Sequence, residues 1–159
     1  MSTPFQVVSR GVETQKPVQR EIRIGAYISC VTHLYETMGQ KHAFLPLQSV
    51  GVPVGINLWF DRDIAFSIEF VPDVGVGGHI LMDNFLFHPG FIRSLSDRAN
   101  IALRLAFDTS GRIGLTPVLG YKLFSTNQSS VSLSIPFPMR FGNGLPASFA
   151  TGVQLGWGF

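Results

Sequence analysis

Charged side chains are scarce in this chain. Only 14% of its 159 residues are Asp, Glu, Lys or Arg, while 45% are hydrophobic and the mean hydropathy is +0.26. So little charge is poorly suited to cover the surface of a soluble domain of this size. The 12 basic residues against 10 acidic ones form no basic run, which argues against a nucleic-acid partner.

Cysteine, long apolar runs and a secretory signal are lacking as well. The single Cys30 excludes an intramolecular disulfide and cannot build a metal cluster alone. No run of 18 or more apolar residues exists, which excludes a transmembrane helix but leaves membrane-spanning strands open. The start, "MSTPFQVVSRGVETQKPVQRE", has neither the basic nor the apolar region of a signal peptide. The chain is therefore either retained where it is made or a mature form whose signal has been removed.

Strict alternation of apolar with small or polar residues fills most of the sequence. The last run shows it best, because Phe149, Thr151, Val153, Leu155, Trp157 and Phe159 alternate with Ala150, Gly152, Gln154, Gly156 and Gly158. A period of two indicates strands, and no helical period is convincing. Eight strands are predicted, at 22–34, 50–60, 64–70, 85–91, 101–107, 113–123, 131–141 and 149–159. The strand at 85–91 is the weakest, because "HPG" interrupts it. Residues 1–20 are predicted to be a polar lead-in segment, and 21–159 to be one barrel domain.

The composition of the two faces indicates which one points inward. One face is almost unbroken Ile, Leu, Val and Phe, as expected for side chains that meet lipid, where a charge costs roughly 2–4 kcal/mol at mid-bilayer. The other face is mostly Gly, Ser, Ala, Asn and Pro, which suits the lining of a narrow barrel better than a solvent surface. Most runs reach the roughly 9–11 residues that a tilted strand needs to cross a bilayer. The prediction is an all-β, eight-stranded antiparallel up-and-down transmembrane β-barrel.

The pattern over residues 21–159 resembles the small eight-stranded outer-membrane barrels, such as the OmpA transmembrane domain and OmpX. The most specific element is the terminal row Val153, Leu155, Trp157 and Phe159, because such proteins typically end in Phe after alternating apolar residues. The resemblance implies that the barrel-assembly machinery reads this row. It also implies that both termini are periplasmic and that the outer loops lie at 36–48 and within 72–84, a glycine-rich segment expected to be strand extension plus loop. These loops are the expected recognition surfaces of such a barrel.

Titratable residues on the predicted inner face indicate an interior polar network. Glu69 and Arg104 are expected at similar depth, where a carboxylate must be paired. Gln154 and one or more of Arg23, Lys122 and Arg140 are expected to support this pair. A structural ion pair that orders the barrel is preferred to a polar pore or gate, because eight-stranded barrels are filled by their own side chains.

The four histidines show no metal-ligand spacing, so no metal site and no cofactor are predicted. They are expected to lie in loops. Barrel deacylases that act on lipid A carry a Ser two residues from a His, as their nucleophilic chemistry requires. The residues two after each His are Tyr35, Phe44, Leu81 and Gly90. No catalytic residue is therefore predicted.

Pro136 and Pro138 remove two amide donors from the same edge of one predicted strand. This indicates either a local bulge or frayed end, or a weakened seam where a lipid or partner protein sits.

These features predict a non-enzymatic bacterial outer-membrane barrel with a structural or accessory role, alone or as a subunit of a larger envelope complex. Its expected partners are the bilayer, the barrel-assembly machinery and other envelope proteins. Two alternatives remain open at this stage: a soluble lipocalin-like carrier of a small hydrophobic ligand, and a lipid-modifying outer-membrane barrel enzyme.

Overall fold

The computed structural model describes residues 21–37, 49–76 and 80–159. Within them the chain forms ten strand segments, all paired antiparallel. The segments are β1 (Arg23–Glu36), β2 (Ser49–Gly51), β3 (Val54–Trp59), β4 (Ile64–Val76), β5 (Ile80–Ser94), β6 (Ala99–Asp108), β7 (Ile113–Ser125), β8 (Ser130–Pro136), β9 (Met139–Gly142) and β10 (Leu145–Gly158). The described residues contain no helix that could cross a membrane. The predicted lead-in at 1–20 lies outside the described residues.

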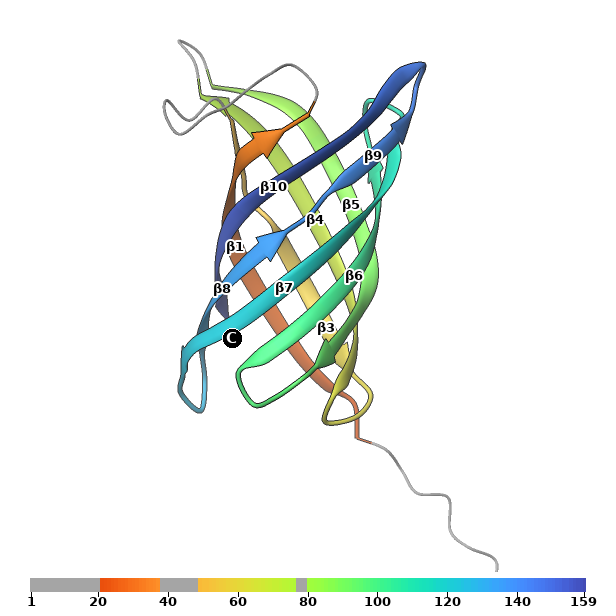
Figure 1. The fold of residues 1–159 in the computed structure, drawn as a ribbon. Coiled ribbons are helices and arrows are strands. Elements are labelled where there is room, and N and C mark those ends of the chain that lie inside the picture. The colour runs from red at the N-terminus through yellow and green to blue at the C-terminus, as the bar shows by residue number, and fades with distance from the viewer. Residues whose placement is uncertain (1–20, 38–48, 77–79) are drawn as a thin grey trace, which may run out of the picture.

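The ten segments close into a barrel with eight strand positions, here called staves (Figure 1). Two staves are each made of two segments: β2 and β3 both pair with β1 and β4, and β8 and β9 both pair with β7 and β10. The pairing of β1 with β10 closes the ring. The predicted all-β, antiparallel up-and-down barrel is confirmed, but the runs expected at 50–60 and 131–141 are each interrupted at proline.

The stagger of the barrel follows from the register. One row of facing residues runs Arg23, Trp59, Ala65, Ile92, Ala102, Val118 and Pro136. Flanking pairs between β8, β9 and β10 have constant register, so Pro136 faces Gly152, which pairs with His33 on β1. The row thus returns to β1 at His33, ten residues beyond Arg23, which gives the barrel a shear number of 10. In an eight-stranded barrel with this shear number the strands tilt by on the order of 40° from the barrel axis.

The large apolar side chains point out of the barrel. Leu103 on β6 is 54% exposed and Phe91 on β5 is 59% exposed, while their neighbours Ala102 and Ile92 are 7% exposed. The small and polar positions are the buried ones, as the composition of the two faces predicts. The apolar calyx of a lipocalin-like carrier requires the opposite orientation, so the structure counts against that alternative.

The connections divide the barrel into two ends. The start of β1 and the end of β10 lie at one end, here called the terminal end, together with the turns at 61–63, 95–98 and 126–129 (Figure 1). The other end, called the loop end, carries the connections at 109–112 and 143–144. At 142–144, "GNG" makes a tight turn in which Asn143 and both glycines have positive φ, a conformation that glycine adopts without strain.

Two sequence predictions about β4 and β5 need correction. The strand extension expected within 72–84 is present, but most of the predicted outer loop is also strand, since β4 continues to Val76 and β5 begins at Ile80. Strand β5 also runs through "HPG", with Pro89 facing Ile68. Proline is tolerated here because the adjacent residues still pair with β4. Of the predicted outer loop at 36–48, only the first two residues are described.

Candidate functional site

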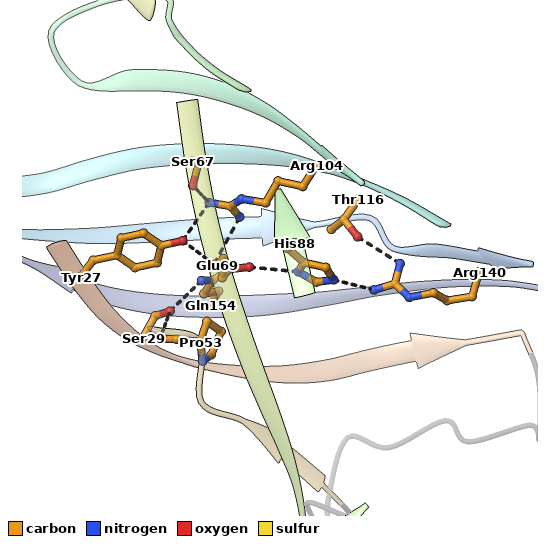
Figure 2. Close-up of polar contacts among 10 residues, drawn as sticks. All are labelled: Tyr27, Ser29, Pro53, Ser67, Glu69, His88, Arg104, Thr116, Arg140 and Gln154. Atoms are coloured by element: carbon orange, nitrogen blue, oxygen red, sulfur yellow. Dashed lines mark hydrogen bonds and ion pairs between the residues drawn. The ribbon is translucent and has the colours of Figure 1, made fainter. Parts of the chain in front are cut away.

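A connected set of polar side chains crosses the middle of the lumen, and Glu69 on β4 lies at its centre (Figure 2). One carboxylate oxygen accepts a 2.7 Å hydrogen bond from the Tyr27 hydroxyl and lies 3.4 Å from Arg104 Nη1. The other lies 3.1 Å from His88 Nδ1. The side chains of Glu69 and Arg104 are only 4% and 8% exposed. Each of these two buried charges therefore has its partner within the lumen of the barrel.

The first row of this network depends on a glycine. Tyr27, Gly55, Glu69 and His88 are successive partners across β1, β3, β4 and β5. A Cβ atom at Gly55 would lie 2.6 Å from the Tyr27 hydroxyl and 2.7 Å from its ring. The phenol therefore lies over Gly55, and this position lets it reach the carboxylate one strand further on.

The next row uses a second glycine in the same way. Ser67, Gly90, Arg104 and Thr116 are successive partners across β4 to β7. A Cβ at Gly90 would lie 2.6 Å from Arg104 Cα and would collide with the Leu103 carbonyl oxygen. Arg104 extends over Gly90, and its Nη2 donates to Ser67 at 3.5 Å and to the Tyr27 hydroxyl at 3.2 Å.

His88 connects this group to Arg140 on β9. Its Nε2 lies 3.1 Å from Arg140 Nη2, and the same guanidinium donates to Thr116 at 3.1 Å. A guanidinium can only donate, so Nε2 must accept, and the Nδ1 proton is left to donate to the Glu69 carboxylate. His88 is therefore a neutral bridge between a negative and a positive group (Figure 2).

This arrangement differs from a hydrolytic triad at the decisive atom. A carboxylate orients the imidazole, as in a triad, but the other ring nitrogen must then face a hydroxyl or thiol. Here that nitrogen faces Arg140. The geometry orders side chains and supplies no activated nucleophile at this His.

The six predicted network residues divide into two groups. Glu69, Arg104 and Arg140 belong to the connected set, and Gln154 lies beside it, where its amide donates to Ser29 at 2.7 Å. The hydroxyl of Ser29 donates in turn to the Pro53 carbonyl. Arg23 and Lys122 lie apart, in the terminal-end half of the lumen.

Sequence reasoning missed Tyr27 and His88. The expectation that the histidines lie in loops is wrong for His88, which is 5% exposed on β5, and for His33, which is on β1. His42 and His79 lie outside the described residues. His88 has the same parity as Gly90 and Ile92, both inward-facing, but the supposed break at "HPG" concealed this signal.

Two cavities lie on either side of the network. The loop-end cavity has a volume of about 320 Å³ and the terminal-end cavity about 690 Å³. Arg104, Val118 and Gln154 line both, so this layer separates them. In the described parts of the chain, no group of three or more His, Cys, Asp and Glu side chains could hold a metal ion.

Replacing Tyr27 with Phe is expected to destabilise the barrel by about 1–3 kcal/mol, because Glu69 loses a hydrogen bond in a buried site. Urea unfolding of the protein in micelles measures the change. Tyr121→Phe is the matched control, since Tyr121 is 48% exposed on the outer face of β7. Equal losses in the two variants would show that the Tyr27 hydroxyl contributes nothing specific.

The remaining predicted residues lie in the wall. Val153, Leu155, Trp157 and Phe159 have the outward parity of β10 and its end, and Leu155, Trp157 and Phe159 are more than half exposed. Pro136 and Pro138 flank the gap between β8 and β9, and their rings line the loop-end cavity.

The fold is similar to that of a designed transmembrane barrel. The chain is similar to the solution NMR structure of the de novo designed TMB2.3, with a TM-score of 0.52 and 7% sequence identity over 86% of this chain and 91% of that one. No protein-family model matches the sequence, and no curated protein matches it either. The likeness concerns the fold alone, and the resemblance to the OmpA and OmpX family remains a prediction.

Proposed function

We propose that this protein is a bacterial outer-membrane β-barrel with a structural or accessory role rather than an enzyme. The membrane location is supported by the outward-facing apolar belt. Ile101, Leu103, Leu105 and Phe107 on β6 are all between 38% and 54% exposed. Single apolar residues on a surface are ordinary, but a belt of them around the wall needs a nonpolar surrounding.

The closed lumen favours a structural role over the role of a pore. Tyr27, Glu69, Arg104, His88 and Arg140 form one connected set between the two cavities. An ion crossing the barrel would have to displace a buried ion pair whose members are already bonded to one another. Small barrels are generally filled in this way, and such filling fixes the cross-section of the wall.

The terminal end is proposed to face the periplasm. The support is the position of the longest connection, 37–48 between β1 and β2, which belongs to the opposite end, as the long outer connections of such barrels do. The loop-end connections at 109–112 and 143–144 are no longer than the terminal-end turns. Strand β10, with its outward row of Val153, Leu155, Trp157 and Phe159, is the proposed recognition element for the barrel-assembly machinery. Other envelope proteins are proposed as partners of the loop end.

Electrophoresis with and without boiling, followed by conductance in planar bilayers, tests this function. We expect a heat-dependent mobility shift, β-rich circular dichroism that requires micelles, and no stable conductance. The double variant Glu69→Ala/Arg104→Ala, folded in the same way, is expected to conduct because it joins the two cavities. Folding without detergent would contradict the membrane location, and stable channels in the unmodified protein would contradict the closed lumen.

A further inference from the structure

The stave formed by β8 and β9 is weakened most along its seam with β10. Pairing of β10 with the neighbouring stave stops between Gln154↔Ser134 and Phe149↔Met139. In the gap the Ala150 amide donates to the Pro138 carbonyl at 2.9 Å. Constant register places Pro136 and Pro138 at ladder positions whose donors would point to β10, and proline has no donor. Two ladder bonds are therefore missing from this seam.

The opposite side of the same stave is interrupted over a shorter stretch. Between the pairs Val118↔Pro136 and Leu115↔Met139 the Phe137 amide donates to the Pro117 carbonyl at 2.8 Å. Pro117 has no amide proton to donate in return, so one ladder bond is missing on this side against two on the β10 side. Figure 1 shows β8 ending and β9 beginning partway along the wall, between β7 and β10. The weakness is thus a seam against β10 and not a frayed end.

The seam has the loop-end cavity behind it. This cavity of about 320 Å³ is apolar where it meets the seam, at Pro136, Pro138 and Ala150, and Pro53, Val71 and Val118 add apolar surface elsewhere in its lining. Its floor is the charged network around Glu69. Asp73, Asp83 and Asp108 line it too, together with Arg112 and Arg140. The apolar space is therefore bounded by charged groups.

The outer side of the seam belongs to the apolar belt. Ile135 is 41% exposed, and the rings of Phe137 and Phe149 stack across the seam with centroids 6.5 Å apart. On β10 the residues at the gap are the small Thr151 and Gly152. The seam therefore lies within the surface that is proposed to face the hydrocarbon region of the bilayer.

We propose that the loop-end cavity binds one unbranched acyl chain of a membrane lipid, which enters sideways through the seam between Ile135–Pro138 and 150–153. The seam lies within the apolar belt, where a charged group is costly, so the chain enters by its methyl end and the headgroup stays outside. The stacked Phe137 and Phe149 rings cover the slot from the lipid side and must separate as the chain passes. This proposal rests on the proposed membrane location.

Photolabelling with lipids that carry a diazirine near the end of one acyl chain tests the proposal. The protein, in a Cys30→Ser background, also carries Phe137→Cys and Thr151→Cys. Constant register makes these two residues a directly opposed pair without ladder bonds, and such a pair brings the Cβ atoms close enough for a disulfide. Labelled residues are mapped by mass spectrometry in vesicles, with the seam reduced and then oxidised.

With the seam reduced, we expect labels on the inward-facing Val71 and Val118 as well as on the outward-facing Leu103. Oxidation should abolish the inner labels and leave Leu103 labelled. Loss of Leu103 labelling in both states would contradict the membrane location instead of the seam. Inner labels that persist after oxidation, or that never form in the reduced state, would overturn the proposal.

A second variant tests the chemistry of the seam without a disulfide. Pro136→Val/Pro138→Val supplies the two missing donors, so inner labelling should fall by about tenfold. Pro89→Val is the matched control in the distant β5 and should change nothing. A diazirine phospholipid and a diazirine free fatty acid are compared in parallel. If both probes label the inward-facing residues, the site accepts acyl chains of phospholipids as well as of fatty acids. If only the fatty acid labels them, the ligand is a free fatty acid.

Discussion

Replacing Arg104 with Met is expected to lower the free energy of unfolding by about 3–5 kcal/mol, because the buried Glu69 loses its ion-pair partner. The carboxylate would retain hydrogen bonds from Tyr27 and His88, but those do not neutralise its charge. Urea titration of the protein in micelles, followed by tryptophan fluorescence and by gel mobility, measures the change.

The double variant Glu69→Gln/Arg104→Met separates loss of the charge pair from loss of packing. It removes both charges and keeps the length of each side chain, so it should recover most of the stability lost by the single variant. Arg62→Met serves as a control, because its ion pair with Asp97 is exposed at the terminal end and should change stability by less than about 1 kcal/mol. If the double variant were as unstable as Arg104→Met, packing of the arginine stem would be the dominant contribution.

Leu103→Arg is the second change with a large expected effect. Leu103 points outward in the middle of β6, and a charge there would lie near the midplane of a bilayer. Barrels that span membranes lose about 2–4 kcal/mol on such a change. Equilibrium unfolding in phospholipid vesicles is the appropriate measurement, since micelles adapt more easily to a charged side chain.

A residue at a different depth in the bilayer provides the control for this prediction. Leu123 also points outward, but it lies near the terminal end of β7, where the interface is close. The same substitution there should cost about 0–1 kcal/mol. On a barrel surrounded by water, neither change should exceed about 0.5 kcal/mol, and equal, small effects would argue against the proposed membrane location.

The period-two pattern was sufficient to predict most of the wall. It identified the strand type, the inward parity of Glu69 and Arg104, and the outward apolar face, because side-chain direction in a strand depends only on parity. Composition then settled the direction of each face. The distance between Glu69 and Arg104 needed the register of two pairings among three strands, β4 with β5 and β5 with β6, and periodicity contains no information about register.

Errors in the prediction arose where proline and glycine were taken to mark the ends of strands. The segment at 72–84 contains three glycines and a proline, yet β4 and β5 pair through much of it, from Pro72↔Phe85 to Val76↔Ile80. Pro89 likewise lies inside a strand, where it faces Ile68 on β4 although the pairing of β5 with β6 is interrupted between Phe87 and Gly90. Long-range pairing with one neighbouring strand is enough to override local breaking signals, and a single sequence does not show that pairing.

The two lumen glycines also set a limit on sequence change among related chains. Gly55 leaves the space that the Tyr27 ring occupies, and Gly90 leaves the space beneath the Arg104 stem. A Cβ atom at position 55 would also lie 2.6 Å from the Ile68 carbonyl oxygen, and one at position 90 would collide with the Leu103 carbonyl oxygen. A smaller residue at 27 or 104 would leave these backbone clashes in place, so relatives that keep the same register and closed lumen should retain both glycines, even where overall identity is as low as that to the designed barrel.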